Sequence, residues 1–207
     1  MNTSHLQQDL RRYCQLALEA GMTDAKVIPA SLIRLDPRVR LKCRYPRCGY
    51  YGSNGNCPPY ATPLSEMQAC IDRYEFGVLF MKRFPSDSLL GARHADYGHA
   101  AGGDVQREMY RVAGRLERAA FRDGHVLAMA FANGPCKKVF CPNAECSAIQ
   151  PGGQCRFPLK SRSSMEGCGI HVFALARSVG WEITPAGHTS TPEEVPELTN
   201  VGLVLVE

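Results

Sequence analysis

The cysteines of this chain follow one spacing twice. Four of them form a C-x4-C-x8-C-x12-C pattern, and the same pattern recurs 98 residues further along the chain. The two sets are Cys43, Cys48, Cys57, Cys70 and Cys141, Cys146, Cys155, Cys168. Gly55 and Gly153 match at the same offset, as do Met67 and Met165. The pattern indicates an internal duplication, and it restricts the fold to one that gathers thiols in two places.

Length and composition favour a metal site over structural disulfides. A chain of 207 residues can bury a core without disulfide support. The N-terminal residues lack the charged and apolar segments of a secretory signal, and no apolar run is long enough to span a bilayer. We therefore expect a cytoplasmic protein without membrane contact. Clustered cysteines in that reducing compartment more often bind metal or act in catalysis than pair with one another.

Basic side chains surround both cysteine regions, although the formal net charge is only +4. They are Arg38, Arg40, Lys42, Arg44 and Arg47 in the first region and Lys137, Lys138, Arg156, Lys160 and Arg162 in the second. Cations beside thiols favour the thiolate form that binds metal, and they could also attract a small anionic substrate. A solvated basic surface is the alternative. Nucleic-acid binding is disfavoured, because no recognition motif with interleaved aromatic residues accompanies the charges.

Apolar periodicity and stop signals predict alternating helices and strands. The predicted helices cover residues 4–20, 62–74, 104–122 and 163–179, and the predicted strands cover 26–28, 32–35, 38–43, 76–81, 126–132, 181–184 and 201–206. Segment 86–103, which contains His94 and His99, is expected to be a surface loop. The fold class is α/β, with a mixed β-sheet and packed helices. Parallel and antiparallel pairing both remain open.

The duplication predicts two pseudo-equivalent halves within a single domain of residues 1–207. The halves cover about residues 25–83 and 125–185, and each has the order strand, cysteine loop, helix, strand. Ser163-x-x-Glu166 matches a capping box, so Glu166 is interpreted as a helix cap rather than as an acid catalyst.

The two halves differ in the number of thiols that their loops supply. The second thiol group has four members, since Cys136 precedes Cys141, Cys146 and Cys155 in a C-x4-C-x4-C-x8-C run. The first thiol group comprises Cys43, Cys48 and Cys57, and the position equivalent to Cys136 is Arg38.

The fourth ligand of the first thiol group is left open by the sequence. Cys168 could complete it from a predicted helix start between Gly167 and Gly169. Cys70 lies deep in a predicted helix, where core packing is the better interpretation. The third possibility is that no cysteine completes the group.

The spacing favours iron–sulfur clusters over zinc. Structural zinc prefers C-x2-C knuckles, and this chain contains none. A [4Fe–4S] cluster accommodates longer spacings, and proline after a ligating cysteine is common in ferredoxin-like runs, as in Cys57-Pro58-Pro59. We expect two [4Fe–4S] clusters, with zinc as the alternative cofactor and a metal-free thiol role as a third possibility.

Three functions are compatible with these ligands. The first is a redox module that passes electrons between a partner protein and an acceptor. The second is an iron–sulfur-dependent oxidoreductase or lyase, in which an incompletely ligated cluster binds a small anionic molecule. The third is a zinc-stabilised binding module without redox activity. Nucleotide binding has no support, because Walker and GxGxxG motifs are absent.

The segments CRYPRCGYYGSNGNCPP and CPNAECSAIQPGGQCRFPLKSRSSMEGCGIHVF resemble a bacterial and archaeal family of predicted metal-binding proteins, domain of unknown function 2284. The family motifs are C…C…YG…CPP, CR-x-P and a PSMEA-like segment. The resemblance implies metal ligation by Cys43, Cys48, Cys57, Cys136, Cys141, Cys146 and Cys155, and it implies no activity beyond metal binding. The chain departs from the family pattern at Ser164, where Pro is usual, and at His171, where Asp is usual.

Overall fold

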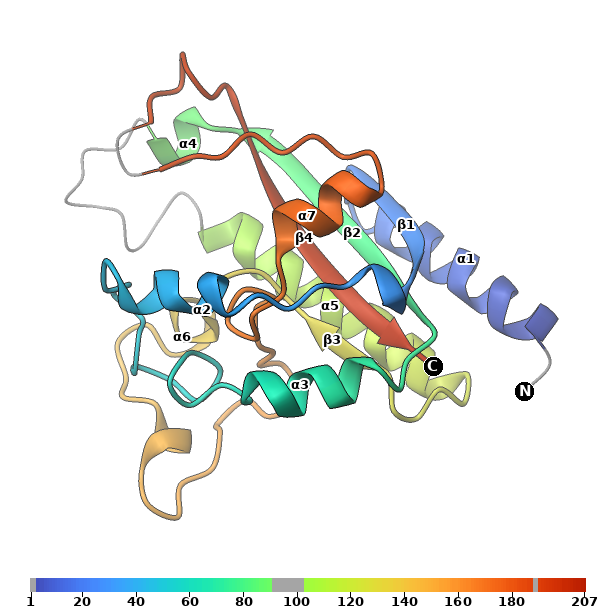
Figure 1. Ribbon diagram of the computed structural model, residues 1–207, viewed down its shortest axis with the longest axis horizontal. Helices are drawn as coiled ribbons and strands as arrows, with labels where there is room; N and C mark the ends of the chain where they lie inside the picture. The colour runs from blue at the N-terminus through green and yellow to red at the C-terminus, as the bar shows by residue number, and fades with distance from the viewer. Residues whose placement is uncertain (1–2, 91–102, 188–189) are drawn as a thin grey trace.

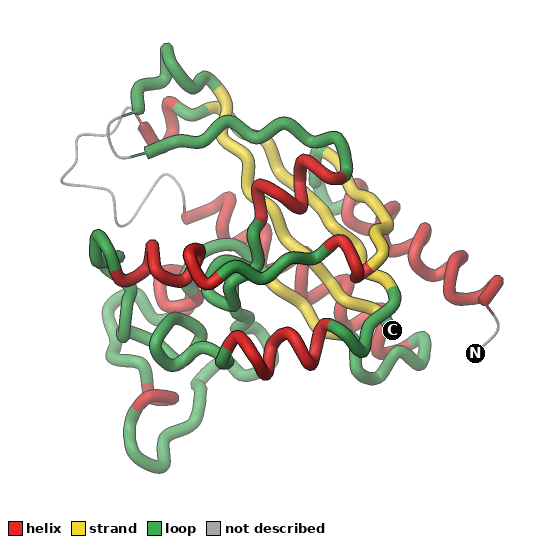
Figure 2. The backbone as a smooth tube through the Cα atoms, in the orientation of Figure 1, coloured by secondary structure: helices red, strands yellow, loops and turns green. Residues whose placement is uncertain are grey.

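A four-stranded antiparallel sheet forms the centre of the computed structural model, which describes residues 3–90, 103–187 and 190–207. The strands are β1 (Asp24–Pro29), β2 (Phe76–Pro85), β3 (Met129–Phe131) and β4 (Glu197–Val206), and their order across the sheet is β1-β2-β4-β3. Helices cover both faces of the sheet (Figures 1 and 2). The α/β class is confirmed, and the pairing that the sequence left open is antiparallel in all three strand pairs.

Two of the helices are long, and the shorter ones either cover the other face of the sheet or lie beside the cysteine loops. They are α1 (Thr3–Glu19), η1 (Ala30–Leu32), α2 (Pro37–Arg44), α3 (Leu64–Ile71), α4 (Asp87–Leu90), α5 (Gly103–Arg122), α6 (Cys136–Phe140), η3 (Ser147–Ile149) and α7 (Val172–Ser178). In both halves a cysteine loop leads into a helix and then into a sheet strand, α3 to β2 and α7 to β4. Because β2 and β4 pair directly, both halves contribute to one sheet.

Helices α1 and α5 pack on one face of the sheet and form the first apolar core. Leu10 of α1 and Leu116 of α5 are fully buried there, together with Val78 and Phe80 of β2. Side chains alternate across a strand, so Leu79, between those two, points to the opposite face. On that face it packs with residues of α3, α7 and the segment that follows β1. The sheet is therefore the middle of three layers.

Glycine is required in β4 where an aromatic ring crosses the strand. A Cβ atom at Gly202 would lie 2.3 Å from Cζ of the buried Phe80 ring. Any larger residue would displace Phe80, because both belong to adjacent strands in direct register.

The predicted strand at residues 38–43 is wrong, because these residues lie in helix α2. Asp36 caps the helix by accepting a 2.8 Å hydrogen bond from the backbone N–H of Arg38, and Pro37 occupies the first turn. The alternation of basic and apolar residues suggested a strand, yet no residue of α2 is buried. The N-cap residue Asp36 and Pro37 in the first turn therefore favour a helix over a strand. Cys43 consequently lies on a helix.

The predicted helix at residues 163–179 is also too long. Residues 164–170 form turns, and α7 begins only at Val172, where Nδ1 of His171 accepts a 3.2 Å hydrogen bond from the N–H of Ala174. Gly169 has φ +88°, and a Cβ atom there would lie 2.2 Å from a side-chain carbon of Leu64. The left-handed glycine breaks the helix. The capping box at Ser163 and Glu166 is therefore not formed.

Smaller corrections concern the remaining elements. Residues 32–35 and 181–184 form no strand, although Trp181 is buried and its Nε1 donates a 2.8 Å hydrogen bond to Asp24. The strand predicted at 126–132 shortens to β3, because Val126 and Leu127 are exposed. Most of the expected loop at 86–103, including His94 and His99, lies outside the described residues. The described parts of it are Ser86, helix α4 and Gly103.

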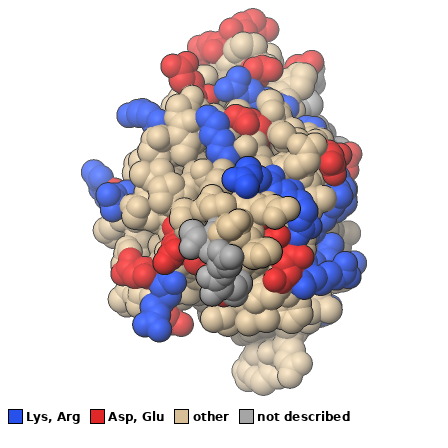
Figure 3. All heavy atoms as spheres, turned by 90° about the vertical axis from the view of Figure 1, so that its right-hand side faces the viewer, with Lys and Arg blue, Asp and Glu red and all other residues tan. Residues whose placement is uncertain are grey.

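Lys and Arg side chains lie among Asp and Glu side chains on the face drawn in Figure 3. Such a mixture of charges is typical of a solvated protein surface. In the described part of the chain, no helix combines the length and the apolar character that crossing a bilayer requires.

Candidate metal centre

The two cysteine loops meet at one end of the sheet, on the left in Figure 1. Asn56 of the first loop joins them: its Nδ2 donates a 2.6 Å hydrogen bond to Oγ of Ser161, and its Oδ1 accepts one of 3.2 Å from Ser163. These contacts connect positions more than a hundred residues apart in sequence. The duplicated loops are thus neighbours in space and form one thiol-rich region.

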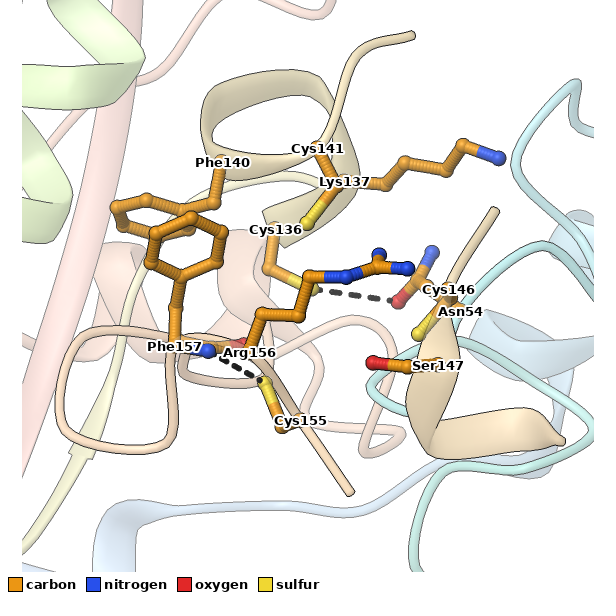
Figure 4. A pocket seen from close by; sticks show the side chains of 11 residues that line it. Asn54, Cys136, Lys137, Phe140, Cys141, Cys146, Ser147, Cys155, Arg156 and Phe157 are labelled. Atoms are coloured by element: carbon orange, nitrogen blue, oxygen red, sulfur yellow. Dashed lines mark hydrogen bonds between the residues drawn. The ribbon is translucent and has the colours of Figure 1, made fainter. Parts of the chain in front are cut away.

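All four members of the second thiol group line one small cavity of about 20 Å³. Their sulfur atoms face a shared space in Figure 4, and the side chain of Arg156 extends between them in this view. Helix α6 supplies Cys136 at its first position, and Cys141 follows its last residue directly. Cys146 and Cys155 flank the turn that contains η3. A short helix and a tight turn therefore bring thiols spaced over twenty residues to one place.

Aromatic rings close one side of this cavity. Phe140 and Phe157, which both line it, stack with ring centroids 5.6 Å apart. The Tyr110 ring of α5 meets Phe140 edge-on at 5.2 Å. An apolar wall of this kind limits water access to a thiolate centre and lowers the local dielectric.

Hydrogen-bond donors point at sulfur in the second thiol group. Nδ2 of Asn56 lies 3.4 Å from Sγ of Cys136, and the backbone N–H of Phe157 donates to Sγ of Cys155 at 3.3 Å. The thiol of Cys136 in turn donates to Oδ1 of Asn54 at 3.5 Å. When Cys136 loses its proton, it keeps the bond from Asn56. Donors of this kind stabilise thiolates.

The pKa of Cys136 is nevertheless raised in the metal-free chain, because burial disfavours the thiolate. Hydrogen bonds from Ser161 and Asn56 act in the opposite direction but are smaller. The expectation that nearby cations lower the thiol pKa therefore fails at this position, since desolvation dominates. A bound metal would supply the compensating positive charge.

Helix α5 holds both ends of the second cysteine loop. Nε2 of Gln106 donates 3.0 Å hydrogen bonds to the carbonyls of Asn133 and Pro135, just before Cys136. The hydroxyl of Tyr110 donates to the carbonyls of Gly134, at 2.9 Å, and of Arg162, at 3.2 Å. The loop is thus fastened where it leaves β3 and where it returns.

An ion pair between Arg162 and Glu117 also anchors the second cysteine loop to α5. Nε of Arg162 lies 3.0 and 2.9 Å from the two carboxylate oxygens of Glu117, and its Nη2 contacts the same carboxylate. The pair is largely buried, with side-chain exposures of 19% and 15%. Glu117 also accepts a 2.9 Å hydrogen bond from the N–H of Ala130 in β3. Arg162 is therefore held by structure, and it is not a free surface cation.

The first thiol group lines a separate cavity of about 210 Å³. Cys43 comes from the end of α2, and Cys48 and Cys57 come from the loop that follows it. Cys48 is exposed, whereas Cys136 of the second group is buried. The first group therefore lies closer to solvent than the second.

Burial raises the pKa of Cys43 and raises that of Cys57 to about 12. Arg40 lowers the pKa of Cys43, but by less than burial raises it. The charge of Cys136 also acts on Cys57, which indicates that the two groups lie within electrostatic range of each other. Asn54 interacts with both of these thiols, and it stands two residues from Asn56.

The first cavity contains a carboxylate in addition to the thiols. Glu166, from the turns after the second loop, lines it together with Cys43, Cys48 and Cys57. Burial raises the pKa of Glu166, and a hydrogen bond with Ser164 acts in the opposite direction. The carboxylate charge also raises the pKa of Cys43. Glu166 is therefore part of the site and not a helix cap.

The structure does not bring Cys70 or Cys168 to either cavity. Cys168 is fully buried in the apolar core beside residues such as Met165 and Ile170, and burial raises its pKa to about 11. Cys70 lies on α3, and Cys14 packs against the core on α1. The expected closure of the first group by Cys168 has no geometric support.

The sequence interpretation missed Asn54 and Asn56, although both lie in the quoted segment SNGNC. Asn and Gly were taken as signals of a tight loop. Their amides contact sulfur only because the second loop packs against the first. An asparagine one residue before a candidate ligand would have been the available signal.

Comparison with known proteins gives one match. A family model described as "Predicted metal-binding protein (DUF2284)" matches residues 26–206. The chain belongs to the DUF2284 family. No curated protein and no solved structure matches the chain significantly.

Metal binding is the function that membership of DUF2284 supports. Among residues 3–90, 103–187 and 190–207, no three His, Cys, Asp or Glu side chains stand close enough to enclose a single metal ion. The donor set of this DUF2284 protein still fits a metal group: seven thiols line two cavities, and donors point at their sulfur atoms. Thiolates are soft ligands, so the set suits zinc, copper(I) or iron–sulfur chemistry.

Proposed function

We propose that this protein is an iron–sulfur protein with two [4Fe–4S] clusters that acts in redox chemistry. The second thiol group would hold one cluster through Cys136, Cys141, Cys146 and Cys155. The first thiol group would hold the other through Cys43, Cys48 and Cys57. The protein would accept single electrons from a redox partner protein and deliver them to a small anionic substrate.

The observation that carries the proposal is the second cavity. Four thiols from one loop line it, and among residues 3–90, 103–187 and 190–207 no three His, Cys, Asp or Glu side chains stand close enough to hold a single ion. Four thiolates that bind zinc must close to roughly 2.3 Å from a single ion, and they would leave little room between them. A cubane is wider and takes four cysteine ligands. The number of thiols and their separation together favour the cluster.

The surroundings of the two groups support different tasks. The second group lies behind Phe140 and Phe157 and has a buried member, Cys136, so this aromatic pair shields one side of it from water. The first group includes the exposed Cys48 and lies in the larger cavity, where a substrate can enter. Asn56 immediately precedes Cys57 and its Nδ2 lies 3.4 Å from Sγ of Cys136, so the two groups are neighbours, as electron exchange between clusters requires. When bound, clusters of this kind supply one-electron transfer, and an incompletely ligated iron adds Lewis acidity.

Metal analysis of anaerobically purified protein tests the proposal directly. We expect a brown protein with iron and acid-labile sulfide in equal amounts, and an EPR signal after reduction. Cys136→Ala should remove the iron and sulfide of one cluster, because it removes one of four ligands. A colourless protein that contains zinc and no iron would instead establish the zinc-stabilised binding module.

A further inference from the structure

The first cavity offers three thiols and needs a fourth donor. A [4Fe–4S] cluster commonly has four protein ligands, and three-cysteine sites leave one iron for another group. The two cysteines that could have completed the set are elsewhere: Cys168 is buried in the apolar core, and Cys70 lies on α3 outside the cavity. A fourth protein donor would therefore come from the other residues that line the cavity.

Glu166 is the acidic residue among the residues that line this cavity. It belongs to the turns at 164–170, which the left-handed Gly169 and the packing of Leu64 hold against the first half. Gly167, its neighbour, lies so close to the carbonyl oxygen of Asn56 that an added Cβ atom would be 3.1 Å from it. The turn that carries Glu166 is thus packed directly against the loop that carries Cys57.

The carboxylate of Glu166 has no cationic partner among the described residues. Arg40, whose charge acts on Cys43, donates instead to the carbonyl of Thr62 at 3.0 Å. A partly buried carboxylate beside three thiols is unfavourable unless a positive charge joins it. The arrangement is therefore an anionic donor set that a metal would stabilise.

We propose that Glu166 is the fourth protein ligand of the first site, which makes that site a three-thiolate, one-carboxylate centre. This inference rests on the proposed function. A carboxylate oxygen is a harder ligand than a thiolate, and it exchanges more readily on iron. The first site is therefore the one at which a small anion can replace a protein ligand. The second site, with four thiolates, does not exchange.

Hydroxyl and amide groups on the cavity wall are suited to an incoming anion. Tyr50, Tyr51 and Asn133 line the cavity, and the guanidinium of Arg47 lies 5.9 Å from the ring centroid of Tyr51. Arg47 is exposed, so it places a positive charge near the cavity wall. These groups favour a small oxyanion or a carboxylate-bearing substrate.

Three variants test the role of Glu166 after anaerobic reconstitution with iron and sulfide. Glu166→Gln keeps the size of the side chain and removes its charge, and Glu166→Cys supplies a thiolate instead. Glu145→Gln is the matched control, because Glu145 is an exposed residue of the second cysteine loop. Iron and sulfide content is measured before and after brief exposure to a chelator, and EPR spectra of the reduced protein are recorded with and without cyanide.

We expect Glu166→Gln to lose about one iron atom per chain more than the natural protein on chelation, because one iron loses its protein ligand. Glu166→Cys should retain its iron, and its EPR signals should no longer respond to cyanide. Glu145→Gln should match the natural protein in both measurements. These results would support the mixed ligand set.

The inference is overturned if both Glu166 variants match the natural protein in iron retention and in the response to cyanide. A natural protein that takes up zinc and no iron would overturn the proposed function as well, so the two failures are distinguishable. If Glu166→Gln does not fold, Glu166→Cys decides by itself, because a persisting cyanide response in that variant contradicts carboxylate ligation.

Discussion

The side-chain amide of Asn56 donates a 3.4 Å hydrogen bond to the sulfur of Cys136, across 80 positions of the chain. Asn56 also immediately precedes Cys57, so one residue adjoins both thiol groups. It is bonded to Ser161 and Ser163, which end the second loop. Asn56 therefore connects the two sites of the duplication, as Asn54 also does.

Replacement of Asn56 by alanine should weaken metal binding at the second site. Cys136 would lose one of the donors that stabilise its thiolate, and the second loop would lose the contacts of Ser161 and Ser163 with Asn56. Loss of such outer contacts typically lowers metal affinity 10- to 100-fold, and we expect about that change. Competition with a chelator, followed by the absorbance of the metal–thiolate bands, measures it.

Asn143→Ala serves as the control for that experiment, since Asn143 is an exposed asparagine of the second cysteine loop. Its affinity should equal that of the natural protein. Equal affinities for Asn56→Ala and Asn143→Ala would show that the bond to Cys136 has no role in metal binding.

Tyr110→Phe should destabilise the metal-free protein. The change removes one hydroxyl and leaves the carbonyls of the half-buried Gly134 and Arg162 without that donor. We expect a loss of about 1 to 2 kcal/mol in the free energy of unfolding, measured by urea denaturation. The ring and its contact with Phe140 persist, so a much larger loss would indicate that the ring itself had moved.

Glu117→Ala should cost more, because it leaves the guanidinium of Arg162 unpaired in a largely buried position. Removal of one partner of such a pair costs about 3 kcal/mol. Asp104→Ala, which breaks an exposed pair with Arg107 on the same helix, should cost about 1 kcal/mol or less. Both changes are measured by urea denaturation. If Glu117→Ala and Asp104→Ala lowered the free energy of unfolding by similar amounts, that result would contradict the structural role of Arg162.

Cys168→Ala should leave the metal content unchanged, because Cys168 is buried in the apolar core and lines neither cavity. The loss of one sulfur atom from packed surroundings should lower the free energy of unfolding by about 1 kcal/mol. Cys136→Ala provides the contrast, since it should lose metal. A lower iron content in Cys168→Ala, at unchanged free energy of unfolding, would show that Cys168 is a metal ligand.

Elements with strong apolar periodicity could be predicted from the sequence, whereas elements with competing signals could not. Helices α1 and α5 and strand β2 follow continuous apolar patterns, and the structure has them near their predicted bounds. Residues 38–43 alternate as a strand does, but the cap at Asp36 prevails because α2 buries none of its residues. The turns at 164–170 replace a predicted helix because Leu64 packs against Gly169.

The sequence alone determined that thiols gather in two related places, because the repeated cysteine spacing and the family motifs are properties of the chain order. It also determined the asymmetry between four thiols and three, since Arg38 stands where a duplicate of Cys136 would be. Only the tertiary structure decided what surrounds them. The contact of Asn56 with Cys136, the burial of Cys168 and the entry of Glu166 into the first cavity all depend on segments distant in sequence. The two halves pack together through one sheet, and this packing brings those segments into contact. Local sequence patterns do not predict such contacts, because the residues that form them are far apart along the chain.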